Sequence, residues 1–184
     1  MRMILIVGLP GSGKSTVANY IRERFGAGIF ISGDIIREEI KRRGLRYTPE
    51  NDSKIAHWFH TSGREKLLIN RLWAKIRKSK KEIIVIDGLR SDDQLRRLVK
   101  LAKSKTFIIS IVASQNVRVK RELKRGRFGK NESAKYVKFR DKLEKSHGIM
   151  TLMKKADYTI DNTHLSVRQG NARTYKIIKE ILAN

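Results

Sequence analysis

The sequence predicts a single α/β domain in which a five-stranded, mostly parallel sheet is covered by helices on both faces. Short apolar runs alternate with longer segments of helical spacing throughout the 184 residues, and the first run leads into a glycine-rich turn. No internal repeat is present, and Pro10 and Pro49 are the only prolines. In a sheet of this kind, ligands gather at the carboxyl ends of the strands.

The glycine-rich turn is the segment Gly8–Thr16, with the sequence GLPGSGKST. It matches the P-loop pattern G-x-x-x-x-G-K-[ST]. The pattern is specific only where a strand precedes it and a helix follows. Here Met3–Val7 is predicted as a buried strand and Val17–Phe25 as a helix. The sequence therefore predicts a P-loop NTPase fold.

The residue types of this turn suit a nucleoside triphosphate bound with Mg²⁺. Glycines let backbone N–H groups point at phosphates beside the positive end of a helix. Lys14 can reach the β and γ phosphates, and the Ser15 hydroxyl is a suitable ligand for Mg²⁺. No N-K-x-D guanine signature occurs, so ATP is the predicted donor, with its adenine near Asn162–Leu165. The residues predicted to bind ATP are Gly8, Pro10, Gly11, Ser12, Gly13, Lys14, Ser15, Thr16 and Asn162.

The other predicted strands are Ile29–Ile31, Ile83–Ile86, Phe107–Val112 and Tyr158–Ile160. One predicted helix follows the second strand and ends near Arg43, and helical patterns run from Thr48 to about Lys78. Further helices are predicted over Asp92–Lys103, from the end of the basic segment Arg118–Lys130 to about Glu144, and over Val167–Leu182. The predicted core comprises residues 1–33, 82–117 and 156–184. A helical acceptor-binding insertion is expected at about 34–81 and a short basic lid at about 118–145.

Asp87 follows a run of four β-branched residues, as the carboxylate of a Walker B strand does. We predict that it holds Mg²⁺ through water, together with Ser15. The next residue is Gly88, where many ATP-driven machines carry a glutamate that orients a hydrolytic water. The pair Asp87-Gly88 therefore favours a kinase over a motor ATPase.

The composition is strongly basic, with 42 Lys and Arg against 18 Asp and Glu and a formal net charge of +24. This excess favours polyanionic partners, among which nucleotides, RNA and acidic lipids remain open, although a solvated basic surface explains it equally well. No cysteine is present, which excludes disulfides and thiolate metal sites. The apolar runs are too short to cross a bilayer or to form a signal-peptide core, so we expect a cytoplasmic protein that does not bind to membranes.

Two strand ends each bring an arginine toward one cleft. Ser32–Arg37, with the sequence SGDIIR, follows the second predicted strand, and Asp87–Gln94, with the sequence DGLRSDDQ, contains the end of the third. Arginine holds a phosphate by two hydrogen bonds and stays charged at any relevant pH. The residues predicted to bind the acceptor are Ser32, Gly33, Asp34, Arg37, Gly88, Arg90 and Gln94.

This pair of motifs resembles that of the nucleoside monophosphate kinases, adenylate kinase above all. There the second strand ends in T/S-G-D-x-x-R and the third in D-G-x-P-R-x-x-x-Q; the present segment lacks the proline and is one residue shorter before its arginine. The resemblance implies that Ser32, Arg37, Arg90 and Gln94 bind an acceptor nucleotide. Nearly the whole chain is also similar to an archaeal family related to adenylate kinase and dephospho-CoA kinase. The matching segments are the P-loop, SGDIIREEIKRRG, TPEN, DGLRS, RDKLEKSHGI and ADYTIDN.

The basic segment Arg118–Lys130 corresponds in this resemblance to the lid of adenylate kinase. Such a lid closes over ATP, excludes water and stabilises charge on the transferred phosphoryl group. The arginines placed in the lid or at its return are Arg118, Arg121, Arg125, Arg127 and Arg140. The residues predicted to act in catalysis are Lys14, Asp87, Arg121, Arg125 and Arg140.

The predicted function is transfer of the γ-phosphoryl group of Mg-ATP to a nucleotide acceptor, with AMP as the first candidate. One alternative is a kinase for dephospho-CoA or another hydroxyl acceptor. Such an acceptor needs a base, and Asp34 is the carboxylate predicted for that role. A second alternative, motivated by the excess charge, is an RNA-associated or ribosome-associated protein that uses ATP as a switch. The sequence leaves the oligomeric state open.

Overall fold

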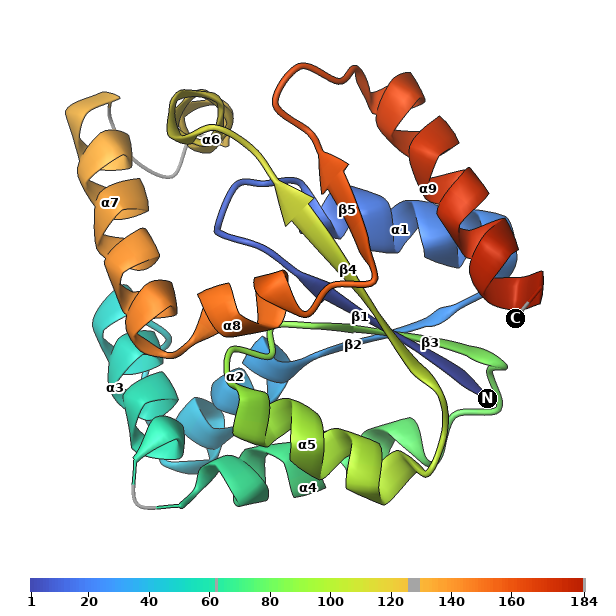
Figure 1. Cartoon of the computed structure of the whole chain (residues 1–184). Helices are drawn as coiled ribbons and strands as arrows, with labels where there is room; N and C mark the ends of the chain where they lie inside the picture. The colour runs from blue at the N-terminus through green and yellow to red at the C-terminus, as the bar shows by residue number, and fades with distance from the viewer. Residues whose placement is uncertain (62, 126–129, 184) are drawn as a thin grey trace.

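Five parallel strands form the centre of the computed structural model, which describes residues 1–61, 63–125 and 130–183 (Figure 1). Their spatial order is β2-β3-β1-β4-β5. The strands are β1 (Arg2–Val7), β2 (Gly28–Ile31), β3 (Ile83–Asp87), β4 (Thr106–Val112) and β5 (Tyr158–Asp161). The predicted α/β fold with a five-stranded parallel sheet is confirmed.

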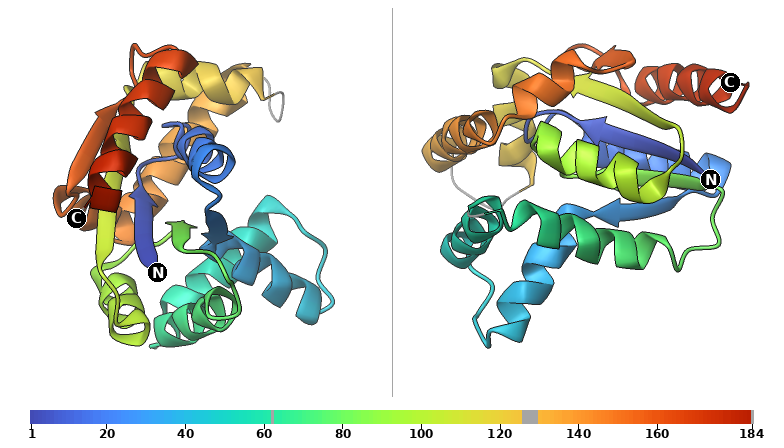
Figure 2. Two further views of the ribbon diagram at one scale, coloured as in Figure 1. Left: turned by 90° about the vertical axis from the view of Figure 1, so that its right-hand side faces the viewer. Right: turned by 60° about the horizontal axis from the view of Figure 1, so that its bottom comes forward.

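The central strands consist of apolar side chains because helices cover the sheet on both faces. Figure 2 shows α1 (Lys14–Phe25) and α9 (Val167–Ala183) packed side by side, and they cover one face. The other face packs against α2 (Ser32–Arg42), α3 (Pro49–His60), α4 (Glu65–Ile76), α5 (Asp92–Ala102) and α8 (Ile149–Lys154). Alternate residues of β1 divide between the two cores, with Leu5 in one and Ile6 in the other.

The structure divides one segment that the sequence analysis had predicted as continuously helical, and it gives the bounds of the helices in the basic segment. The helical segment from Thr48 to about Lys78 is α3 and α4, separated by a turn at Gly63, whose φ is +71°. The basic segment after β4 contains α6 (Gln115–Lys124) and α7 (Lys130–Ser146). A left-handed Gly148, with φ of +94°, then redirects the chain into α8, for which the sequence analysis had no prediction. Glycine adopts this conformation at little cost, so both reversals use it.

The strand register brings the P-loop and the two predicted acceptor segments to one edge of the sheet. Asp87 ends β3 and is paired with Ile6 of β1 on one side and Ile31 of β2 on the other. The P-loop begins two residues after Ile6, and α2 begins directly after Ile31. Helices α6 and α7 pack against each other at the same edge (Figure 1). Within the described residues, no helix is both long and apolar enough to cross a membrane.

Candidate active site

The P-loop connects β1 to α1 and curls around its own backbone. Gly13 precedes α1 with φ of +108°, and a Cβ atom there would overlap the side-chain amide of Asn162. Any other residue at this position would strain the backbone and displace the Asn162 side chain. The Lys14 ammonium lies over the loop and donates a hydrogen bond of 2.8 Å to the carbonyl of Gly8.

Side chains from distant segments hold the P-loop backbone from behind. The Arg121 guanidinium donates to the carbonyl oxygens of Gly11 and Ser12, and also to the carbonyl of Asn162 at 2.7 Å. The Asn162 amide donates to the same Ser12 carbonyl at 2.8 Å. Two P-loop carbonyls that a free loop would leave to water are therefore fixed by Arg121 of α6 and by Asn162 at the end of β5.

Arg118 is a structural residue, which corrects its predicted place in the lid. Its side chain is buried and binds the carboxylate of Asp141 on α7 through two hydrogen bonds of 2.6 and 2.7 Å. The same guanidinium donates to the carbonyl of Pro10 in the P-loop. Arg118 therefore joins α6, α7 and the P-loop, and it has no free face for a nucleotide.

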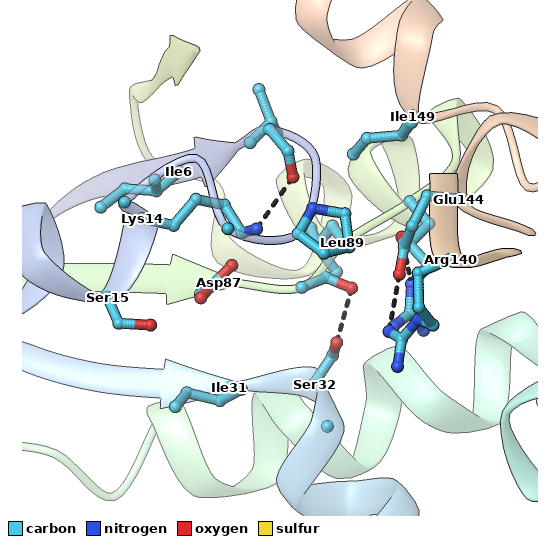
Figure 3. A pocket seen from close by; sticks show the side chains of 18 of the residues that line it. Ile6, Lys14, Ser15, Ile31, Ser32, Asp87, Leu89, Arg140, Glu144 and Ile149 are labelled. Atoms are coloured by element: carbon cyan, nitrogen blue, oxygen red, sulfur yellow. Dashed lines mark hydrogen bonds and ion pairs between the residues drawn. The ribbon is translucent and has the colours of Figure 1, made fainter. Parts of the chain in front are cut away.

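A cavity of about 220 Å³ opens between the P-loop, the ends of β2 and β3, and α7 (Figure 3). The side of the cavity next to the P-loop contains Lys14, Ser15 and Asp87. Its far side contains Arg90, Arg140 and Glu144. The other predicted site residues along its wall are Gly8, Pro10, Gly11, Gly13, Ser32, Gly33, Gly88 and Arg125. The structure thus brings together residues from the P-loop, both strand-end segments and the predicted lid region.

Asp87 lies at the base of the cavity, between Lys14 and Ser15 in the view of Figure 3. Burial raises the pKa of its carboxyl, and the charges of Lys14 and Arg90 oppose that rise. Its Oδ1 atom is buried and has no hydrogen-bond partner among the described residues. A buried carboxylate oxygen without a partner, next to the Ser15 hydroxyl, provides the hard oxygen donors that Mg²⁺ prefers. The residues present therefore fit a magnesium ion held by Ser15 and Asp87.

Glu144 joins the two arginines on the far side of the cavity. Its carboxylate accepts a hydrogen bond of 2.7 Å from Nε of Arg90 and one of 2.9 Å from a terminal nitrogen of Arg140. Burial opposes ionisation of Glu144, but the two guanidinium groups outweigh burial and lower its pKa to about 2. This end of the cavity therefore carries two fixed positive charges and one fixed negative charge. The shortened turn after β3 leaves Arg90 at the cavity wall.

Three residues predicted to bind the acceptor are not among those that line this cavity. The Asp34 carboxylate pairs with the guanidinium of Arg37, and both side chains are about half exposed on the first turns of α2. Gln94 is buried, and its side-chain oxygen accepts a hydrogen bond of 2.8 Å from the backbone N–H of Arg90. Gln94 therefore fixes the turn that carries Arg90. Asp34, the predicted base, has no place at the cavity wall.

Ser32 and Gly88 lie at the cavity wall and contact each other. The Ser32 hydroxyl donates a hydrogen bond of 2.6 Å to the carbonyl of Gly88. This bond connects the ends of β2 and β3. Gly88 has φ of +94°, and any Cβ atom there would overlap the Ser32 hydroxyl oxygen. The two residues therefore set the distance between the segments predicted to bind the acceptor.

A second cavity, of about 270 Å³, lies between the P-loop and the segment that follows β5. Thr16, Arg121 and Asn162 line it together with the apolar side chain of Leu165. Arg125 borders both cavities and also pairs with Glu122 at 3.0 Å. This second cavity is where the sequence analysis had expected the adenine. Of the remaining predictions for the lid, Arg127 lies outside the described residues.

Comparison with known proteins agrees with this geometry. A family model described as an AAA domain matches residues 7–137. A UPF0200 protein of Hyperthermus butylicus is 32% identical over 97% of this chain and 94% of its own length. The chain belongs to the UPF0200 family. A second member, from Pyrobaculum aerophilum, is 34% identical over 98% of this chain and 99% of its own length.

Solved structures show how widely the fold of this UPF0200 chain is shared. The TT1252 protein of Thermus thermophilus superposes with a TM-score of 0.65 at 18% identity, over 97% of this chain and 96% of its own. Shikimate kinase from Acinetobacter baumannii, in complex with shikimate, superposes with a TM-score of 0.56 at 19% identity, over 100% of this chain and 93% of its own. At this level of identity, the similarity shows a kinase-like P-loop fold.

Sequence reasoning did not assign a role to Glu144 in this UPF0200 chain. The signal was present, because Arg140 and Glu144 stand four residues apart and therefore lie on one face of a helix. The second partner of Glu144, Arg90, could not be predicted from helical spacing. Arg90 lies 54 positions earlier, and only the packing of α7 against the end of β3 brings it to Glu144.

Proposed function

We propose that the protein transfers the γ-phosphoryl group of Mg-ATP to an acceptor bound in the cavity between the P-loop and α7. The observation that carries the proposal is the composition of this one cavity. Lys14, Ser15 and the buried Asp87 line its donor side, and two arginines face them from the other side. A donor and an acceptor held at these two sides would meet inside the cavity.

The donor side would bind the phosphates of ATP through the P-loop amides and Lys14. Binding requires the Lys14 ammonium to exchange its hydrogen bond with the Gly8 carbonyl for phosphate oxygens. When bound, Mg²⁺ neutralises charge on the β and γ phosphates. Ser15 and Asp87 are the residues that would hold it. The second cavity, bordered by Arg121, Asn162 and Leu165, has the place expected for the adenine.

The acceptor side would hold an anion by means of Arg90 and Arg140. Both guanidinium groups are oriented in advance by Glu144, so little side-chain entropy is lost when the acceptor binds. Arg125, at the border of the two cavities, can stabilise charge on the group in transfer. Catalysis would then rest on positioning and electrostatics. AMP is the first candidate acceptor because its phosphate suits the paired arginines.

A hydroxyl acceptor, such as dephospho-CoA, is the second candidate function. Two observations favour it. Gln94, the amide expected to bind an acceptor nucleotide, is buried and occupied by the backbone of Arg90. Glu144 also reduces the positive charge available to a phosphate on the acceptor. Asp87, Glu122 and Glu144 are carboxylates that line the cavity, so a base for a hydroxyl would be sought among them before Asp34.

The test is transfer of labelled phosphate from ATP to AMP, other monophosphates and dephospho-CoA in parallel. Lys14→Ala serves as the blank. We expect one preferred acceptor, labelled by the wild type and unlabelled by the blank. Asp34→Asn should leave transfer to every acceptor nearly unchanged, because this carboxylate lies outside the cavity. If ATP binds tightly and no acceptor is labelled, the proposed function is wrong.

A further inference from the structure

The outward surface of α7 carries cations and one aromatic ring. Lys135, Lys138, Lys142 and Lys145 are exposed and follow one another at spacings of three, four and three residues. At 3.6 residues per turn, the four lysines occupy an arc of about 80° and extend for about 15 Å along the helix. We call this surface, together with Phe139, the α7 outer face. In Figure 1, α7 stands at the edge of the molecule, away from the sheet.

The acidic side chains of α7 in the segment 134–146 point the other way. Asp141 is buried against Arg118, and Glu144 is buried against Arg90 and Arg140. None of the four lysines forms an ion pair with another described residue. The helix therefore separates its charges by face, and the outer positive charge is not neutralised within the described part of the chain. Among the described side chains of α7, no carboxylate on this face would compete with an anionic partner.

Phe139 lies beside this row of lysines and is 56% exposed. Phe139 is four residues from Lys135 and three from Lys142, so these two lysines are its neighbours on the helix surface, and the ring borders the lysine row. Because the Phe139 ring is exposed, it contributes little to the hydrophobic core. An exposed ring among cations is, however, the combination by which proteins bind single-stranded nucleic acid, with bases stacked on rings and phosphates on cations.

We propose that the α7 outer face binds single-stranded RNA. Lys135, Lys138, Lys142 and Lys145 contact phosphates, and a base stacks on Phe139. A duplex is a poorer partner, because its bases are stacked on one another and do not reach a ring on a convex helix. The proposal does not depend on the kinase reaction, since none of these residues lines either cavity.

The test is binding of a labelled oligouridine of about 12 nucleotides, measured by fluorescence anisotropy at about 50 and 200 mM salt. Phe139→Ala should weaken binding roughly 5- to 100-fold, and Phe139→Trp should restore it. The double variant Lys142→Glu/Lys145→Glu should weaken binding and reduce the salt slope by about 1.4, since each phosphate contact on a single strand contributes about 0.7. Thermal melting of each variant establishes that it is folded.

The matched control is Lys176→Glu/Lys179→Glu on α9, which makes the same change in net charge with the same three-residue spacing on another exposed helix. It should weaken binding much less than the α7 pair. Equal losses for the two pairs would show that total charge alone attracts the RNA, and the proposal would be overturned. Unchanged affinity in Phe139→Ala, or equal competition by duplex DNA or anionic vesicles, would overturn it as well.

Discussion

Glu144 shows how a single carboxylate can organise one side of a site. It is buried, yet it remains ionised because Arg90 and Arg140 both bind it. Without it, two largely buried guanidinium groups would repel each other at the cavity wall. Breaking a buried ion pair on one side is costly, since the remaining charge loses its partner and stays away from water.

Glu144→Gln is therefore expected to lower the free energy of unfolding at pH 7 by about 3 kcal/mol. The folded pKa of about 2 lies below the ordinary value of 4.5, so the contribution of Glu144 is fully present above pH 4.5. It is lost as the pH falls toward 2. Urea unfolding of both proteins at pH 7 and pH 3 measures the difference. A gap that stays the same at both pH values would contradict this assignment.

His60 and His147 form a second charge-sensitive group directly behind Arg90. Their rings stack with centroids 4.1 Å apart. Burial first, and then the charge of Arg90, lowers the pKa of His60 to about 4. Because the ordinary value is 6.5, the unfolded chain binds the proton more readily between pH 6.5 and 4. The stability contributed by a neutral His60 is therefore lost as the pH falls through this window.

Wild-type protein is accordingly expected to lose about 2 kcal/mol more stability than His60→Gln between pH 7 and pH 5. His164→Gln, at an exposed position, is the matched control and should follow the wild type. Chemical unfolding at the two pH values gives the comparison. The account of His60 fails if its variant and the control change in parallel.

At the scale of elements, α6 and α7 form a single unit with the P-loop. Arg118 on α6 binds Asp141 on α7 and the carbonyl of Pro10, while Arg121 binds the next two carbonyls, those of Gly11 and Ser12. The helices that flank the cavity are thus connected to the loop expected to hold ATP. A change in the loop can be transmitted to α7 through these contacts.

Arg118→Met is expected to destabilise the protein by about 3–5 kcal/mol, because it leaves the Asp141 carboxylate buried without a counter-charge. The double variant Arg118→Met/Asp141→Leu should be more stable than this single variant, since it removes the unpaired charge. Urea unfolding of the wild type, both single variants and the double variant completes the cycle. A double variant no more stable than Arg118→Met would show that the pair does not carry this energy.

The elements themselves could be predicted largely from local sequence. The β-branched runs, the P-loop and the turn residues predict the strands and most helices, because these signals act within a few positions. The roles of Arg118, Gln94 and Glu144 could not be predicted, because each depends on a partner from another element. An arginine at helical spacing looks the same whether it faces a nucleotide or a buried carboxylate. The short α8 also escaped prediction, since six residues carry too little periodicity.

At the scale of the whole molecule, the chain combines a P-loop fold with a large positive charge. The described acidic residues of α7 form buried ion pairs with Arg118 and with the two cavity arginines. Its exposed lysines face the solvent. The molecule therefore presents two distinct positive regions, one within the cavity and one on the α7 outer face. The first suits small phosphorylated ligands and the second an extended polyanion.

The central claim is that donor and acceptor meet in the cavity between the P-loop and Arg90. The most direct measurement is steady-state phosphoryl transfer to the preferred acceptor by the wild type, Lys14→Ala and Arg90→Met, with ATP affinity measured separately. We predict that Lys14→Ala abolishes transfer, and that Arg90→Met raises KM for the acceptor about tenfold or more while ATP affinity is unchanged. Unchanged acceptor KM in Arg90→Met, or transfer that survives in Lys14→Ala, would contradict the account.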